Sequence, residues 1–235
     1  MTQSRRVWVL GASRGIGAAV ARALSHHQLV VSARSESMLQ TLATSLNSPT
    51  VVVHPCDVTN PASLDAVHAA INAPHGPIDV LVYCAGIGTF APLVDLTSND
   101  LDQHLAVNVR GLFHALKLVI PGMTARQYGH IVNINSVAVL EPFANCSVYG
   151  ASKAAARAML RSLRTEVRAD GVKVTDIYVG ATDTDIWPSA ARSEHGHRMM
   201  SPADVANVVA SVIDHSLAPQ LHLEEILLRP QGGDL

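Results

Sequence analysis

The chain has few charged residues and no long apolar run, and each shortage excludes a class of partner. Asp, Glu, Lys and Arg make up 15% of its 235 residues, and the formal net charge is −2. Without a basic face or tail, a nucleic-acid partner is not expected. No run reaches about 18 apolar residues, so no membrane span is expected. Residues 1–6 lead directly into an apolar run, which leaves no room for a signal peptide.

Cysteine is scarce, which excludes a disulfide framework. The chain has three cysteines, Cys56, Cys84 and Cys146. They form an odd set without metal-site spacing, which favours reduced thiols in a cytoplasmic protein. Histidine is more frequent, with twelve residues that include His26, His27, His195 and His197. No metal-ligating set on a common face is recognisable among them, so no metal site is predicted.

Short apolar runs alternate with helix-like segments along the whole chain. Runs such as Val51–Val53 are nearly continuous, as in strands that are covered on both faces. The alternation predicts an α/β, doubly wound Rossmann fold with a mainly parallel sheet of about seven strands. The expected strands are 5–10, 29–33, 50–54, 78–83, 129–134, 172–178 and 224–228. The expected helices are 15–25, 36–46, 61–72, 98–126, 147–168 and 202–215.

The first apolar run is followed by a glycine-rich turn and then by a good helix former. The turn is Gly11-Ala12-Ser13-Arg14-Gly15-Ile16-Gly17. In such a turn one glycine permits the tight bend, one lets the backbone approach a pyrophosphate, and one lets the helix pack on the strand. The phosphates then meet free N–H groups at the helix N-terminus. The order of strand, glycine turn and helix predicts a dinucleotide site.

Tyr149 and Lys153 are four residues apart in a stretch that is typical of a helix. At this spacing the two side chains lie on one face, one turn apart. A phenol has a pKa of about 10, so alone it is a poor acid or base near neutrality. A neighbouring ammonium is expected to lower that pKa. The pair therefore predicts a proton-transfer device.

With these motifs in place, the chain resembles the short-chain dehydrogenase/reductase family, in its ordinary, non-extended subfamily. The resemblance covers essentially the whole chain, and its motifs occur in the family's order. Besides Tyr149 and Lys153, the matching segments are Gly11-x3-Gly15-x-Gly17, Cys56-Asp57-Val58-Thr59, Cys84-Ala85-Gly86, Asn108 within 107–111, Ser136 within 134–136, 179–185 and 224–230.

The resemblance implies hydride transfer between a nicotinamide cofactor and a carbonyl or alcohol carbon. It makes Tyr149 the general acid in reduction and the base in oxidation. Lys153 would lower the pKa of that tyrosine and bind the nicotinamide ribose, Ser136 would hold the substrate oxygen, and Asn108 would bind a water in a proton relay. The implied cofactor-binding residues are Gly11, Ser13, Arg14, Gly15, Ile16, Gly17, Arg34, Asp57, Val58, Cys84, Ala85, Gly86, Tyr149, Lys153, Gly180, Thr182 and Thr184.

Three positions depart from the family pattern. Leu10 replaces the usual threonine before the first glycine, Tyr83-Cys84 replaces Asn-Asn, and Val179 replaces the proline before Gly180. The first two changes remove hydrogen bonds that steady the central strand, so local repacking is expected. The third leaves a less rigid loop with an extra N–H near the nicotinamide.

Charge at the end of the second strand governs the choice of cofactor. NAD sites usually carry an acidic residue there. Here Arg34 follows the strand, and Arg14 lies in the glycine turn. An arginine fork suits a 2′-phosphate, so NADP(H) is preferred over NAD(H). Glu36 is the counterargument, but it is expected to begin the next helix.

One domain is expected over 1–235, with a cofactor half at about 1–135 and a catalytic and substrate half at about 136–235. The irregular stretch 185–201 predicts a lid or a surface loop. Apolar cleft walls at 87–89, 137–140, 180–181, Ile186-Trp187 and Met199-Met200 predict a small or medium uncharged carbonyl or secondary alcohol as the substrate.

The resemblance also implies a homodimer or homotetramer with helix 147–168 in its interface. Two alternatives stay open. One is an NAD-dependent alcohol dehydrogenase, and the other is a non-catalytic dinucleotide-binding sensor or scaffold on the same fold.

Overall fold

The computed structural model describes residues 4–46, 48, 50–215 and 220–233, so both ends of the predicted 1–235 domain lie outside the described residues. The strands are β1 (Arg6–Leu10), β2 (Gln28–Ser32), β3 (Thr50–Val53), β4 (Val80–Tyr83), β5 (Gly129–Ser136), β6 (Val172–Val179) and β7 (Glu225–Leu228). The α-helices are α1 (Gly15–Ala23), α2 (Glu36–Ser45), α3 (Pro61–His75), α4 (Ser98–His104), α5 (Leu112–Ala125), α6 (Ser147–Val167), α7 (Ser189–His195) and α8 (Pro202–His215).

The seven strands form one sheet in the order β3-β2-β1-β4-β5-β6-β7. Every neighbouring pair is parallel, so each connection crosses over to return to the same end. The order reverses between β1 and β4, because the chain first builds outward on one side of β1 and then on the other. Such a reversal opens a crevice at the carboxyl ends of the strands. The predicted doubly wound Rossmann fold is confirmed.

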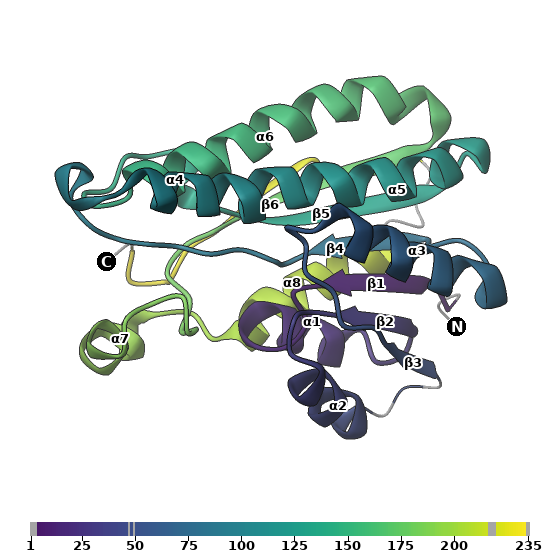
Figure 1. Ribbon diagram of the computed structural model, residues 1–235, viewed down its shortest axis with the longest axis horizontal. Helices are drawn as coiled ribbons and strands as arrows, with labels where there is room; N and C mark the ends of the chain where they lie inside the picture. The colour runs from purple at the N-terminus through teal and green to yellow at the C-terminus, as the bar shows by residue number, and fades with distance from the viewer. Residues whose placement is uncertain (1–3, 47, 49, 216–219, 234–235) are drawn as a thin grey trace.

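Helices cover both faces of the sheet, which explains why its strands are almost continuously apolar. Side chains of α3, α5 and α6 pack on one face, around Trp8 and Leu81. Side chains of α1, α2 and α8 pack on the other face, around Val9 and Val82. Figure 1 shows α5 and α6 on one side of the sheet and α1 and α2 on the other, with α7 apart from both layers.

The segment predicted as one helix over 98–126 is instead three consecutive pieces. α4 begins with a capping box of Thr97 and Asp100, and α5 runs from Leu112. Between them Leu105–Gly111 is π-helical and contains the buried Asn108. A π-helical turn inside an α-helix often marks a functional site. Here the phenol of Tyr83, at the end of β4, donates a hydrogen bond of 2.6 Å to the carbonyl of Val107 within the π segment.

The other departure from the predicted elements concerns the irregular stretch 185–201. It contains α7 and a short 3-10 turn, Gly196–Arg198. The two ends of the stretch lie side by side. The carbonyl of Met200 accepts from the N–H of Asp183, and the N–H of Met200 donates to the carbonyl of Ala181. The stretch is therefore a closed excursion beyond the end of β6.

α6 is the longest helix, with 21 residues, and side chains on it anchor it to the sheet. Arg157 donates to the phenol of Tyr178 on β6 at 2.9 Å, and the buried Arg164 donates to the carbonyl of Val174 at 3.0 Å. These bonds fix the position of α6 along β6. Within the described part of the chain, no helix combines the length and apolarity that crossing a membrane requires.

The Tyr83 bond to the π segment gives a stability prediction. Tyr83→Phe removes the donor to a buried carbonyl and is expected to lower the free energy of unfolding by about 1–2 kcal/mol. Urea denaturation measures the difference. Tyr128→Phe, at a residue that is 40% exposed, is the matched control and should change little. Equal stability of Tyr83→Phe and the native protein would contradict the anchoring role of this bond.

Candidate active site

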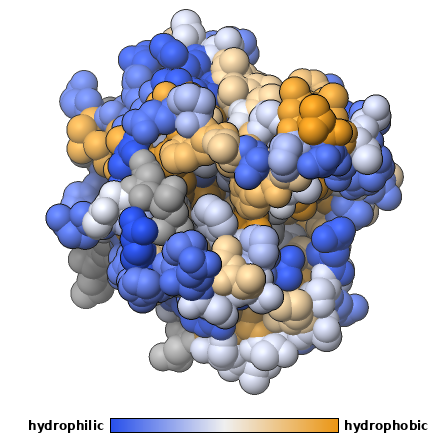
Figure 2. Space-filling view, turned by 90° about the vertical axis from the view of Figure 1, so that its left-hand side faces the viewer, coloured by the Kyte–Doolittle hydropathy of each residue, from blue (hydrophilic) through white to orange (hydrophobic). Residues whose placement is uncertain are grey.

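A cleft of about 1010 Å³ lies at the carboxyl ends of the strands and is lined by residues from both halves of the chain. Figure 2 views the left-hand end of Figure 1 and shows this face hollowed near its centre. Every residue predicted to bind the cofactor lines the cleft. Of the four predicted catalytic residues, Ser136, Tyr149 and Lys153 line it as well, whereas Asn108 lies outside the lining set.

Two glycines of the turn after β1, Gly11 and Gly17, have no room for a side chain. Gly11 has φ +87°, and a Cβ there would lie 2.5 Å from the backbone nitrogen of Ala85. A Cβ on Gly17 would lie 2.1 Å from the carbonyl oxygen of Gly11. Arg14 precedes α1 without a side-chain capping bond. The first N–H groups of α1 have no partner within the helix, so the turn offers backbone donors and a positive helix end to an anion in the cleft.

Two arginines border the same end of the cleft. Arg14 is exposed and pairs with Asp185 at 3.6 Å, and Arg34 follows β2 and is also exposed. Glu36, the residue that argued against an NADP-type site, begins α2 as expected. The exposed pair of Arg14 with Asp185 is weak, as surface pairs generally are, so the guanidinium remains available to an anionic ligand.

Ser136, Tyr149 and Lys153 meet at the centre of the cleft. Ser136 ends β5, and the other two lie in the first two turns of α6. The Ser136 hydroxyl accepts from the N–H of Ala138 at 3.1 Å and hydrogen-bonds the Tyr149 phenol. The Lys153 ammonium donates to the carbonyl of Ile134 at 2.9 Å. All three are buried, so each polar group acts in a largely water-free setting.

The electrostatics of the pair differ from the sequence-based expectation. Lys153 was expected to lower the pKa of Tyr149, but burial raises that pKa to about 12, opposed by the hydrogen bond from Ser136. The Lys153 nitrogen lies 5.9 Å from the centre of the tyrosine ring. Burial also lowers the pKa of Lys153 to about 8. Desolvation is the largest influence on the pKa of both groups, so the phenol is held protonated.

Asn108 clamps the loop that follows β4. Its carbonyl accepts from the N–H of Ile87, and its amide donates to the carbonyl of Ile87 and to the Ser152 hydroxyl, with distances of 2.9 to 3.0 Å. A Cβ on Gly86 would lie 3.5 Å from the Asn108 oxygen and 3.6 Å from the Lys153 nitrogen. The side chains of Asn108 and Lys153 therefore both lie close to Gly86.

Phe90, which forms an aromatic wall with the predicted wall residue Trp187, was not found from the sequence. The two rings stack with centres 5.2 Å apart, and Phe90 meets Tyr149 edge-on at 5.4 Å. The Nε2 atom of His104 accepts from the N–H of Thr89 at 3.0 Å and so fixes the loop that carries Phe90. The residues around Phe90 in the sequence do not distinguish it from an ordinary core residue, so its place in the cleft wall could not be recognised.

A backbone bond joins two loops of the cleft. The N–H of Ala91 donates to the carbonyl of Asn145 at 3.0 Å. Asn145 has φ +62°, a left-handed conformation that asparagine tolerates better than most residues. The loop after β4 and the loop before α6 are therefore tied to each other at the cleft.

The predicted walls at 87–89, 137–140, 180–181 and Ile186-Trp187 line the cleft, except for Thr89, Val139 and Leu140, which are not among the described lining residues. The expectation that Met199-Met200 forms an adaptable wall is wrong, because neither residue is among the described residues that line it. Met200 instead pairs with Thr182 as an isolated bridge at the base of the 185–201 stretch. Its backbone bonds hold it there, away from the substrate end.

A buried polar cluster beneath the site was also missed. Asp176 of β6 is 1% exposed and accepts from the side-chain amides of Asn133 and Asn135 on β5, at 2.7 and 2.8 Å. The sequence held a signal, since a single acidic residue interrupts an otherwise buried strand, 172–179. Burying an ionised carboxylate costs free energy unless hydrogen bonds and an opposite charge compensate it.

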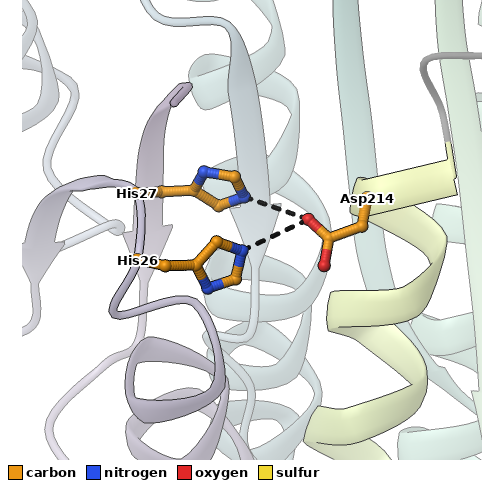
Figure 3. A group of neighbouring side chains, drawn as sticks. All are labelled: His26, His27 and Asp214. Carbon is orange, nitrogen blue, oxygen red and sulfur yellow. Dashed lines mark hydrogen bonds and ion pairs between the residues drawn. The ribbon is translucent and has the colours of Figure 1, made fainter. Parts of the chain in front are cut away.

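His26 and His27 converge on Asp214 of α8, a set that the sequence did not reveal (Figure 3). Both Nε2 atoms lie near one carboxylate oxygen, at 3.3 and 3.2 Å. The backbone N–H of Arg5 donates to Nδ1 of His27, which places the proton of a neutral ring on Nε2. That nitrogen then donates to Asp214. These contacts describe a hydrogen-bonded clamp between α8 and the start of β2 rather than a set of free ligands.

Comparison with known proteins agrees with this geometry. Residues 5–195 match the family model for short chain dehydrogenase. An uncharacterized oxidoreductase of Staphylococcus haemolyticus is 31% identical over 94% of this chain and 95% of its own length. Sepiapterin reductase of Chlorobaculum tepidum is 33% identical over 97% and 96%.

A solved structure has the same fold and contains NADP. It is a metagenomic short-chain oxidoreductase in complex with NADP, with a TM-score of 0.84, 31% identity, and coverage of 98% of this chain and 99% of the other. The chain therefore belongs to the short-chain dehydrogenase/reductase family and is an oxidoreductase of that family.

Proposed function

We propose that the protein is an NADP(H)-dependent oxidoreductase that interconverts a small or medium uncharged carbonyl compound and the corresponding secondary or primary alcohol. The observation that carries the proposal is the meeting of Ser136, Tyr149 and Lys153 in one cleft with the glycine turn. The cofactor, when bound, supplies or accepts the hydride at the nicotinamide ring. The protein supplies binding, orientation and proton transfer.

The residues fit a dinucleotide. Gly11 and Gly17 let the turn pack directly against Ala85 and against itself, and the start of α1 would present backbone N–H groups to the diphosphate. Arg14 and Arg34 border the end of the cleft where a 2′-phosphate would be recognised. The NADP complex of a relative with 31% identity supports the same cofactor. Lys153 would hold the nicotinamide ribose.

Tyr149 would transfer the proton. Because burial raises the pKa of its phenol to about 12, the residue is protonated at neutral pH and ready to donate to a carbonyl oxygen. The Ser136 hydroxyl, within hydrogen-bond reach of that phenol, would hold the same oxygen. In the oxidation direction the phenolate would accept the alcohol proton, which requires stabilisation of its charge by Lys153.

The substrate end of the cleft favours an uncharged compound. Its wall is formed by Phe90, Ile186 and Trp187. Arg192 of α7, a cation close to this end of the cleft in sequence, donates to Asp183 at 2.7 Å and to Asp185 at 2.6 Å. Two carboxylates already neutralise this arginine, so a third from a substrate would have to displace one of them.

Residues 185–201 would act as a lid over the substrate end of the cleft. The bridge between Met200 and Thr182 would fix the base of the lid, and Trp187 stacks on Phe90. We also expect a homodimer or homotetramer, in which α6 and the exposed Phe113 of α5 would be covered. The small side chains of Ala154 and Ala155 on α6 would permit close packing with a second copy. A cytoplasmic location remains an expectation from the sequence.

The first prediction for function concerns proton transfer. Tyr149→Phe should lower kcat by roughly 10²–10⁴-fold while NADPH binding stays nearly unchanged, because the ring remains and only the acid is lost. Turnover is measured by NADPH absorbance with a panel of carbonyl compounds, and binding by NADPH fluorescence. Near-normal turnover of the variant would exclude Tyr149 as the acid and base, and inactivity of the native protein with NADPH bound would favour the sensor alternative.

The second prediction concerns cofactor choice. NADPH should bind more tightly than NADH, and Arg34→Asp should narrow or reverse the preference. Charge-assisted bonds to a phosphate contribute roughly 1.5–3 kcal/mol, which corresponds to about 10- to 150-fold in Kd. Arg22→Asp makes the same charge change at an exposed residue near the far end of α1 and should leave the ratio unchanged. Equal native dissociation constants for the two cofactors would favour the NAD-dependent alternative.

The third prediction concerns substrate charge. A neutral ketone should have a higher kcat/KM than the matched ketone that carries a carboxylate, and Arg192→Ala should not change the ranking, since Arg192 is already paired. Methyl esters and free acids of the same ketone give the comparison. A strong preference for the acid that disappears in Arg192→Ala or Arg198→Ala would overturn the neutral-substrate proposal and leave the reductase assignment standing.

A further inference from the structure

Asp176 is a buried carboxylate whose two oxygens are both engaged. It lies in the interior of β6 and is directly paired in register with Asn133 of β5. Its Oδ1 accepts from the Asn133 amide and its Oδ2 from the Asn135 amide. Asn133 and Asn135 lie on the same face of β5 because side chains alternate along a strand. Two donors aimed at one side chain favour the ionised carboxylate.

The second of these amides connects Asp176 to the site. The Asn135 carbonyl oxygen accepts from the N–H of Ser136 at 2.9 Å, and its amide nitrogen lies 3.4 Å from the carbonyl of Lys153. Asp176 dictates the orientation of the Asn135 amide, because only its nitrogen can donate to a carboxylate. With the nitrogen facing Asp176, the oxygen is left to hold the backbone of Ser136.

Asp176 also lies within electrostatic range of Lys153. Burial lowers the pKa of Lys153, and Asp176 is the strongest influence that opposes this effect. Burial raises the pKa of Asp176, while the two amides and Lys153 lower it. The other ionisable groups that face Asp176 are Glu225 of β7, which opposes its ionisation, and Tyr178 of its own strand. Glu225 is paired with Arg157 at 3.3 Å.

We propose that Asp176 is a positioning residue of the active site, which supplies the buried negative charge that keeps Lys153 an ammonium and fixes Asn135 against the backbone of Ser136. Asp176 is not itself among the residues that line the cleft, so it acts on the site through Asn135, which lines the cleft, and through Lys153. The role in catalysis rests on the proposed reductase function, whereas the charge relation to Lys153 does not.

The charge relation can be measured without any substrate. The chain has only three lysines, Lys117, Lys153 and Lys173, so lysine labelled with ¹³C at the ε-carbon gives three resolvable NMR titrations. Lys153→Ala assigns the Lys153 resonance. In Asp176→Asn the titration of Lys153 should move down from about 8 by about one pH unit or more, because an opposite charge is lost nearby. Glu225→Gln removes a negative charge that Arg157 already neutralises and should shift it much less.

A double variant that exchanges the two side chains distinguishes loss of the charge from general damage to the fold in Asp176→Asn. Asn133→Asp combined with Asp176→Asn moves the carboxylate to the paired position on β5 and keeps an amide donor between the strands. It should restore the Lys153 titration toward the native value. With a carbonyl substrate, the alkaline limb of the pH profile of kcat/KM should move to lower pH in Asp176→Asn and return in the double variant. Asn133→Ala keeps the carboxylate but removes one of its two donors, so it should lower stability and move that limb less than Asp176→Asn does.

The outcomes separate the two proposals. An unchanged Lys153 titration in Asp176→Asn would overturn the inference, as would an alkaline limb that moves as far in Asn133→Ala as in Asp176→Asn. A Lys153 titration that shifts and returns in a protein that reduces no carbonyl compound would uphold the charge relation and reject the proposed function instead.

Discussion

The close approach of backbones beside the end of β1 is the constraint on which the rest of the site depends. Gly11 lies so near Ala85, and Gly17 so near the Gly11 carbonyl, that neither position admits a side chain. This contact sets the start of α1 against the ends of β1 and β4, at the point where the strand order reverses. Because a parallel sheet places all carboxyl ends together, Ser136 at the end of β5 arrives at the same crevice.

The second constraint is electrostatic. The centre of the site brings a phenol, an ammonium and a carboxylate into an interior with little water. Isolated charges in such a setting are strongly disfavoured, so each needs a partner. The carbonyl of Ile134 and the amides of Asn133 and Asn135 supply part of that compensation, all from β5. β5 is therefore both a central strand of the sheet and the source of hydrogen bonds to Lys153 and Asp176.

The residues proposed from the sequence to bind the cofactor line one cleft. The sequence predicted the fold well, because the fold depends on local patterns. Apolar runs placed all seven strands, and the glycine spacing placed the turn. It failed where the outcome depends on contacts between distant segments. The break of 98–126 around Asn108 involves the phenol of Tyr83, from another strand. Asp214 meets two histidines that lie 187 and 188 residues earlier. The lowered pKa expected for Tyr149 came from neighbouring charge alone, whereas burial, which no sequence pattern reports, decides its direction.

The backbone bond between Ala91 and Asn145 has a consequence for how new specificities arise. It joins two sides of the cleft into a collar whose shape is set by main-chain atoms, so side-chain substitutions there alter its width little. The segment from Ile186 to Met200 meets this collar through the stacking of Trp187 on Phe90, and the backbone of Met200 pairs with Thr182 at its base. Variation in this segment can reshape the opening while leaving proton transfer intact. Selection for bulkier or differently shaped compounds is therefore expected to accumulate changes there, and the collar to stay as it is.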